Sequence, residues 1–215
     1  MGTANATNSP SREQLGVIIL AAGKGARMRS SQAKVLHRLA GKPLLRHVIQ
    51  ASQRLHPSRL VVVVGHQADA VRRICDGDDV LFALQKEQRG TGDAVRAAEE
   101  QFQGFRGDIL IVYGDVPLLT TQTLARFVAE HRAQQTTLSV LTARLEDPAQ
   151  YGRVIRQADG QVDRIVEARD ASKQELAVQE INTGIYCVHA DFLFSALDRL
   201  QPTNAQGEYY LTDTV

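Results

Sequence analysis

The chain has 215 residues, of which 43% are hydrophobic and 23% charged, and its formal net charge is +1. This length favours one compact domain, and the composition excludes a disordered chain. No apolar run reaches the ~18 residues of a membrane span, so the sequence predicts no membrane partner.

Cys75 and Cys187 lie far apart, which fits neither a disulfide framework nor a zinc site. Without a secretory signal, we expect a cytoplasmic protein.

Charge is unevenly distributed along the chain. Residues 1–60 carry ten Lys or Arg and one acid, whereas residues 61–215 carry fifteen Lys or Arg and twenty-three acids. The basic segment favours an anionic partner, either nucleic acid or a phosphorylated small molecule, although a solvated surface explains the same bias about as well. Nucleic acid is disfavoured because the cations cluster around one glycine loop without interleaved aromatic residues.

The first two-thirds of the chain alternate between predicted strands and helices. Residues 1–13 are small and polar and are predicted to form a disordered leader, followed by one domain over 14–215. Predicted strands span 15–21, 60–64, 80–84, 108–113 and 136–143, and predicted helices start at Pro43 or span 68–75, 92–102 and 120–132. This alternation predicts an α/β fold with a doubly wound, mostly parallel sheet.

The pattern changes near residue 150. Two short runs, 153–157 and 162–167, flank Asp159-Gly160, which is a hairpin signal. A strand at 185–188 and a helix at 191–200 follow. We therefore expect a small α+β excursion from the doubly wound part.

The loop after the first strand carries the strongest functional signal. Residues 20–28 read LAAGKGARM and follow a buried strand, where open α/β sheets bind ligands. Gly23 and Gly25 allow backbone N–H groups to approach phosphate oxygens, and Arg27 adds a cation that grips phosphate. The glycine spacing excludes both the dinucleotide fingerprint and the P-loop. Phosphate binding is favoured over a plain strand–helix turn.

Together with Lys34-Val35-Leu36, this loop resembles the start of the sugar-1-phosphate nucleotidylyltransferases. Within them, the sequence is most similar to the amino-terminal uridylyltransferase domains of the bifunctional N-acetylglucosamine-1-phosphate uridylyltransferase/glucosamine-1-phosphate acetyltransferases. The resemblance implies a Rossmann-like nucleotidylyltransferase fold whose α+β excursion binds sugar. It also implies Mg²⁺-dependent transfer of a uridylyl group from UTP to N-acetylglucosamine 1-phosphate. The products would be pyrophosphate and UDP-N-acetylglucosamine, a precursor of peptidoglycan and lipopolysaccharide.

A second motif, QKEQRGTGDA over residues 85–94, follows the third predicted strand. The Gln85 amide has a donor and an acceptor, which suits the edge of a nucleobase, and the glycines let the backbone approach a flat base. A loop that merely caps a helix is the alternative. The resemblance implies uracil recognition by Gln85, Gly90 and Thr91, although Asp93 stands where the family has histidine.

An acid, Asp115, lies just past the fourth predicted strand. Mg²⁺ prefers one or two carboxylates together with phosphate oxygens and waters, and phosphate and acid motifs share this sheet edge. An aspartate that caps the turn before Pro117 is the alternative. The resemblance likewise assigns Asp115 to Mg²⁺ and the Tyr113-Gly114 backbone to the nucleotide sugar.

The resemblance also assigns roles to the remaining site residues. Arg27 and Lys34 would be the catalytic cations that hold the triphosphate, although a solvated surface position is the usual place of a lysine. Nucleotide binding would fall to Leu20, Ala21, Ala22, Gly23, Gly25, Gln85, Gly90 and Thr91. Sugar binding would fall to Tyr113, Gly114, Gly152, Glu167 and Asn182, some of which have the short polar groups that sugar hydroxyls and an acetamide require.

The family pattern continues beyond Asp213, whereas this chain ends at Val215. We therefore expect a domain truncated at its C-terminal end, without the downstream asparagine that the family uses as a metal ligand. We also expect it to lack the acetyltransferase β-helix through which the family trimerises, so the oligomeric state stays open. Two alternatives remain: a nucleotidylyltransferase for another base or sugar phosphate, and a non-catalytic fragment that binds nucleotide sugars. The segment 207–213 matches the family; its chemistry suggests no role other than packing a helix beside the site.

Overall fold

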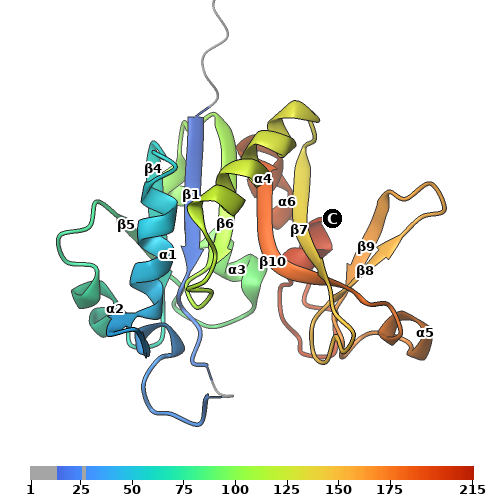
Figure 1. Cartoon of the computed structure of the whole chain (residues 1–215), viewed down its shortest axis with the longest axis horizontal. Coiled ribbons are helices and arrows are strands. Elements are labelled where there is room, and N and C mark those ends of the chain that lie inside the picture. The colour runs from blue at the N-terminus through green and yellow to red at the C-terminus, as the bar shows by residue number, and fades with distance from the viewer. Residues whose placement is uncertain (1–13, 26–27) are drawn as a thin grey trace, which may run out of the picture.

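An eight-stranded mixed sheet forms the centre of the computed structural model, which describes residues 14–25 and 28–215 (Figure 1). Its strand order is β5-β4-β1-β6-β10-β8-β9, and β7 pairs with β10 off this path. The predicted leader, 1–13, lies outside the described residues.

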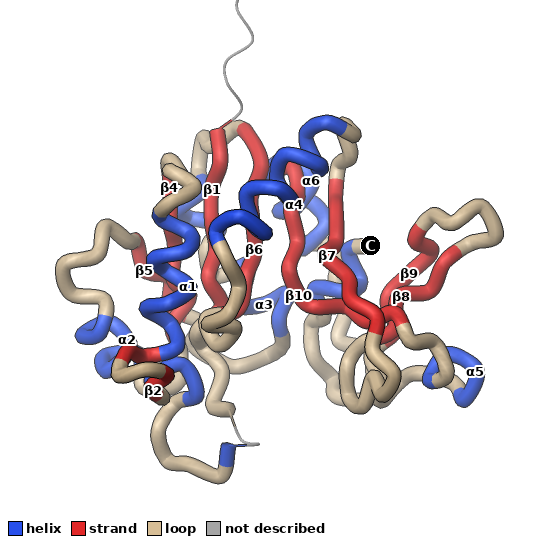
Figure 2. The backbone as a smooth tube through the Cα atoms, viewed as in Figure 1, coloured by secondary structure: helices blue, strands red, loops and turns tan. Residues whose placement is uncertain are grey.

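Four parallel strands make the doubly wound part, as the sequence predicts: β1 (Gln14–Leu20), β4 (Arg59–Val64), β5 (Leu81–Leu84) and β6 (Gly107–Tyr113). Three of these strands are runs of Val, Ile and Leu because both faces of the sheet are covered. In the register of the sheet, Leu20 lies opposite Val63 of β4 and Tyr113 of β6. The loops that follow β1, β4 and β6 therefore leave from one edge of the sheet, where Figure 2 shows loops gathered at the bottom.

Helices cover both faces of this part of the sheet. They are α1 (Leu44–Gln53), α2 (Ala68–Ile74), α3 (Thr91–Arg96), α4 (Thr121–Ala133) and α6 (Ala190–Leu197). Because side chains alternate along a strand, Val17 and Ile19 of β1 pack in the cluster of α1 and α4, whereas Ile18 and Leu20 pack in that of α3 and α6. Figure 1 shows α1 and α4 in front of the sheet and α6 behind it. Within the described ranges, no helix is both long and apolar enough to span a bilayer.

The second part of the chain is antiparallel and extends the sheet from β6. It consists of β7 (Leu138–Arg144), β8 (Arg153–Arg156), β9 (Val162–Val166), α5 (Lys173–Leu176) and β10 (Glu180–His189). Strand β10 pairs with β6, β7 and β8. The hairpin predicted at Asp159-Gly160 joins β8 to β9, which together with α5 form the α+β excursion on the right of Figure 1.

Several predicted boundaries differ from the structure. The predicted helix at 92–102 ends as α3 at Arg96 and continues as a separate 3-10 turn, Glu99–Phe102. Strand β10 is longer than the predicted 185–188. Its first half was not predicted because it contains polar residues and a bulge, where Gly184 has a φ of +79°. Short elements were not predicted: α5, the hairpin of β2 (Arg38–Leu39) and β3 (Lys42–Pro43), and the 3-10 turns Lys34–Leu36 and Leu211–Thr214.

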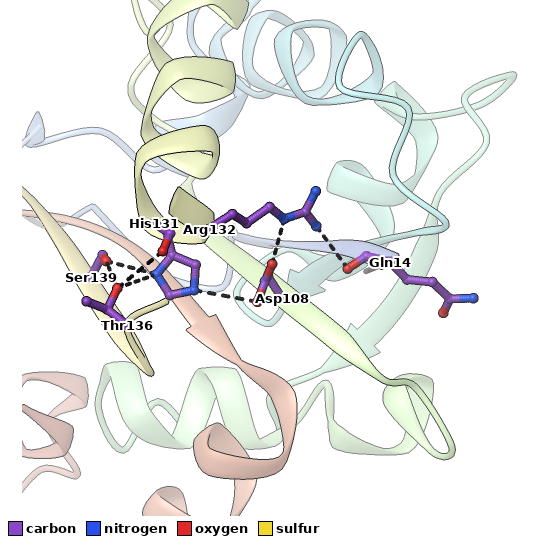
Figure 3. A network of polar contacts seen from close by, with 6 residues as sticks. All are labelled: Gln14, Asp108, His131, Arg132, Thr136 and Ser139. Carbon is purple, nitrogen blue, oxygen red and sulfur yellow. Dashed lines mark hydrogen bonds and ion pairs between the residues drawn. The ribbon is translucent and has the colours of Figure 1, made fainter. Parts of the chain in front are cut away.

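A buried ionic network lies at the amino-terminal end of β6, opposite the end from which the loop after β6 leaves (Figure 3). The carboxylate of Asp108 accepts a hydrogen bond of 2.7 Å from Arg132 Nε and lies 3.5 Å from His131 Nε2. The other ring nitrogen of His131 is 2.8 Å from the Ser139 hydroxyl. Burial by itself raises the pKa of Asp108, but the contacts with His131 and Arg132 outweigh burial and hold that pKa below its usual value. The network thus ties α4 to β6 and β7.

Replacing Asp108 with alanine should lower the free energy of unfolding by about 3 kcal/mol, because it leaves His131 and Arg132 without their buried partner. A carboxylate with a lowered pKa stabilises the fold above its unfolded pKa and loses that effect as pH falls through the folded value. The free energy of unfolding, measured with urea, should therefore change less between neutral and acidic pH in D108A than in the wild type. The exposed Asp198 supplies the control, D198A, and an unchanged urea midpoint in D108A would contradict the expectation.

Candidate active site at the carboxyl edge of the sheet

The loops after β1, β5 and β6 surround a cavity of about 280 Å³, which we call the loop cavity. All of the residues predicted to bind nucleotide line it: Leu20, Ala21, Ala22, Gly23, Gly25, Gln85, Gly90 and Thr91. Lys34, Tyr113 and Asp115 line it as well. The glycine loop and the predicted metal ligand thus face the same cavity.

A second cavity of about 600 Å³ lies next to the first, and we call it the excursion cavity. Glu167 and Asn182, both predicted to bind sugar, line it. Thr91, Tyr113 and Glu208 line both cavities, so the two form adjoining parts of one site.

Two predicted sugar-binding residues lie behind the walls rather than in them. A Cβ on Gly152 would be 3.4 Å from Glu167 Oε1, and the Gly152 carbonyl accepts the Asn182 backbone N–H at 2.9 Å. The Gly114 N–H donates to the Leu20 carbonyl at 2.9 Å, which joins the ends of β6 and β1. Both glycines hold the lining residues in place by close backbone packing.

The glycine loop lies directly over Lys34. Gly25 has a φ of +67°, and a Cβ there would be 2.6 Å from Lys34 Cβ, so this position requires glycine for conformation and for space. The Lys34 ammonium forms an ion pair of 2.6 Å with Asp115 Oδ2, and their side chains are 41% and 23% exposed. Lys34 is therefore a paired residue of the cavity rather than a solvated surface lysine. The predicted cation Arg27 lies outside the described residues.

Gln85 lines the loop cavity and is only 5% exposed. Its amide nitrogen donates to the Gly90 carbonyl at 3.1 Å and to Asp93 Oδ2 at 2.8 Å. Its backbone N–H donates to the carbonyl of Val64 at 2.8 Å. Gln85 is therefore held at its backbone and at its amide nitrogen.

The segment 207–213, whose role the sequence leaves open, forms a wall of the site. The Tyr209 backbone donates to the Arg89 carbonyl and accepts from Gly92 N–H, both at 2.8 Å. The Thr91 hydroxyl accepts a further backbone N–H of the segment at 3.0 Å. Glu208 of the same segment lines both cavities. The segment thus packs against the start of α3 beside the site. The sequence allowed such packing but did not show that Glu208 lines both cavities.

The excursion cavity combines an acid with an oriented amide. Burial, followed by the nearby acids Asp170, Asp213 and Glu208, raises the pKa of Glu167. The Asn182 amide nitrogen donates to the Tyr186 hydroxyl at 2.8 Å, and its oxygen accepts the Gly184 N–H at 2.8 Å. Such groups can hydrogen-bond the hydroxyls of a sugar.

Among the residues that the structure describes, no three His, Cys, Asp or Glu side chains gather in a cluster that could hold a metal ion. Asp115, the ion-pair partner of Lys34, lines the loop cavity, as does a second carboxylate, that of Glu208. This arrangement can bind phosphates through backbone N–H groups and an ammonium, beside a carboxylate.

The model of the MobA-like NTP transferase domain matches residues 17–207 of the chain. The chain belongs to this family. Membership confirms the nucleotidylyltransferase resemblance that the sequence motifs indicate. The matched residues include the glycine loop, Asp115 and most of the residues that line the two cavities.

Curated relatives of this NTP transferase domain include the bifunctional protein GlmU of Geobacter metallireducens, 52% identical over 202 residues, which are 94% of this chain and 42% of that protein. GlmU of Enterococcus faecalis is 47% identical over 198 residues, 92% of this chain and 43% of the relative. The chain therefore spans less than half the length of the curated relatives it matches.

Solved structures confirm the fold. A UDP-glucose pyrophosphorylase complexed with UDP-glucose superposes with a TM-score of 0.76 at 16% identity, over 94% of this chain and 85% of that chain. A putative glucose-1-phosphate thymidylyltransferase of Bacillus anthracis gives 0.74 at 24% identity, over 93% and 80%. The Rossmann-like nucleotidylyltransferase fold expected from the sequence is thus the fold of this chain.

Proposed function

We propose that this domain transfers a uridylyl group from UTP to N-acetylglucosamine 1-phosphate in the presence of Mg²⁺ and releases pyrophosphate. The observation that carries the proposal is the joining of the two cavities through Thr91, Tyr113 and Glu208. One cavity has the glycine loop and the buried Gln85 amide, which would bind the nucleotide, and the other has the Glu167 carboxylate and the Asn182 amide, which would bind the sugar. The resemblance to the uridylyltransferase domains supports the choice of substrates, and the similarity to the GlmU relatives supports that resemblance.

The reaction would be a single in-line displacement. A phosphate oxygen of the sugar phosphate attacks the α-phosphorus of UTP, a new P–O bond forms, and the bond to pyrophosphate breaks. The attacking oxygen is already anionic, so no strong base is needed, and catalysis depends on positioning and on neutralising charge. Backbone N–H groups at Gly23–Gly25 and the Lys34 ammonium would hold the phosphates. Half-exposed Lys34 can exchange the Asp115 carboxylate for a phosphate oxygen.

The residues present fit a magnesium ion held mainly by substrate. Mg²⁺ is commonly bound by one or two carboxylates plus phosphate oxygens. Asp115 Oδ2 contacts Lys34, whereas Oδ1 has no polar partner within the described part of the chain. Asp115 would hold the ion, which when bound would supply positive charge to the reacting phosphates.

Replacing Glu167 with glutamine should raise the KM for the sugar phosphate about tenfold, the usual effect of losing a charge-assisted hydrogen bond. The KM for UTP should stay the same because Glu167 lines the excursion cavity and not the loop cavity. Since the pKa of Glu167 is raised, wild-type kcat/KM for the sugar phosphate should fall on acidification before the ordinary carboxyl range is reached, and E167Q should lack this early fall. Exposed Glu146 supplies the control, E146Q, and equal KM values for both variants would refute the assignment.

Pyrophosphate release tests the proposal directly. All four NTPs are combined with several hexose and hexosamine 1-phosphates, and we expect turnover to be fastest with UTP and N-acetylglucosamine 1-phosphate. Turnover with another pair would favour a related nucleotidylyltransferase of different specificity. Tight binding of UDP-N-acetylglucosamine without turnover would favour a non-catalytic nucleotide-sugar-binding role.

We propose further that residues 14–215 form one nucleotidylyltransferase domain that works in the cytoplasm. The two cysteines are free and buried, which suits a reducing compartment.

A further inference from the structure

The orientation of the Gln85 amide is determined by chemistry and by its neighbours. Its nitrogen faces the Gly90 carbonyl oxygen and Asp93 Oδ2, and both of these atoms can only accept hydrogen bonds. Turning the amide over would place its oxygen against these two acceptors, and the Gly90 carbonyl and Asp93 Oδ2 would lose their donor. Only one orientation is therefore compatible with the contacts.

This orientation decides what Gln85 offers to a ligand. Both N–H bonds of the amide are used inside the protein. The remaining atom, Oε1, makes no hydrogen bond to any described residue, and it is not among the enclosed polar atoms that lack a partner. Gln85 lines the loop cavity, so its side chain presents an acceptor, and no donor, to a base bound there.

Asp93 makes the stronger of the two amide contacts. It lies in the first turn of α3, where an acidic residue also suits the helix dipole, but its carboxylate is directed to Gln85 at 2.8 Å. The other acceptor, the Gly90 carbonyl, belongs to the backbone, so it does not depend on which side chain the sequence places at that position.

We propose that Asp93 is a positioning residue for base selection, because it orients the Gln85 amide so that Oε1 faces the bound base. An acceptor at this place favours a pyrimidine with a ring N–H between two carbonyls, as in uracil. It disfavours cytosine, whose corresponding ring nitrogen is itself an acceptor and would repel Oε1. The inference rests on the proposed function and names the group that sets its nucleotide preference.

Calorimetric titration with UTP and with CTP tests this inference. The wild type should bind UTP more tightly, and D93A should reduce the ratio of the two affinities by about tenfold, because the amide can then turn over. D93N should keep most of the preference, since its side-chain oxygen can still accept from Gln85. In a Q85A background, D93A should not change the ratio further, because Asp93 acts through Gln85.

A purely structural role for Asp93 gives different results. It would lower the melting temperature of D93A without changing the affinity ratio, and this outcome would overturn the inference. So would equal wild-type affinity for UTP and CTP. The control is D191A, which removes an exposed acid from the first turn of α6. Pyrophosphate release, measured on the same samples, tests the proposed function separately. If UTP is turned over but D93A leaves the ratio of UTP to CTP affinity unchanged, only the inference about Asp93 is wrong.

Discussion

Replacing Asp115 with asparagine should lower the kcat of the proposed uridylyl transfer by a hundredfold or more, the usual cost of removing one electrostatic group from such a site. The change keeps the shape of the side chain but removes the charge that pairs with Lys34 and that would hold Mg²⁺. The fold should persist because Asp115 lies on the loop after β6 and is not part of the buried core. The measurement is the rate of pyrophosphate release over a range of Mg²⁺ concentrations, with the melting temperature recorded for the same samples.

The matched control is D198N, which makes the same substitution at an exposed acid beyond the last residue of α6. D198N should behave as the wild type at every Mg²⁺ concentration. If D115N turned over at a rate within a few-fold of D198N, Asp115 would not be the metal ligand of this reaction.

Replacing Lys34 with glutamine should also slow the reaction by about a hundredfold, because it removes a positive charge from the loop cavity where the phosphates would bind. In the absence of substrate the ammonium neutralises Asp115 at 2.6 Å, so the variant would leave two anionic partners, carboxylate and triphosphate, side by side. The KM for UTP should rise together with the fall in kcat. Steady-state kinetics with varied UTP measure both effects.

The control for this prediction is K173Q, which removes an exposed lysine from the first turn of α5, outside the residues that line either cavity. Its kinetics should match those of the wild type. Equal kinetic constants for K34Q and K173Q would mean that Lys34 is an ordinary surface lysine despite its ion pair.

The parallel half of the fold could be predicted because its physical signals are local. Runs such as residues 60–64 are buried on both faces and are therefore continuous and β-branched. The start of β10 could not be predicted in the same way. Asn182 is polar and Gly184 is conformationally flexible, and both residue types are common in turns. Pairing with β7 makes this segment a bulged strand instead.

The loop cavity could be predicted from topology, since the carboxyl ends of parallel strands meet at one edge. Its wall from segment 207–213 could not, because the contact of this segment with Thr91 joins residues 120 positions apart. The same limit applies to the network around Asp108, where the partners come from β6 and α4. The contact between Asp93 and Gln85 is close in sequence, but only the structure shows that the two side chains meet.

Nuclear magnetic resonance titration with UDP-N-acetylglucosamine tests most directly whether the two adjoining cavities hold one nucleotide sugar. It does not depend on turnover. We expect one saturable event that shifts backbone amides in both cavities, at Gly25 and Gly90 on the nucleotide side and at Glu167 and Asn182 on the sugar side. Amides around Asp108, at the opposite end of β6, should stay unchanged. Shifts confined to one cavity, shifts centred elsewhere, or no saturable change at millimolar ligand would contradict the account.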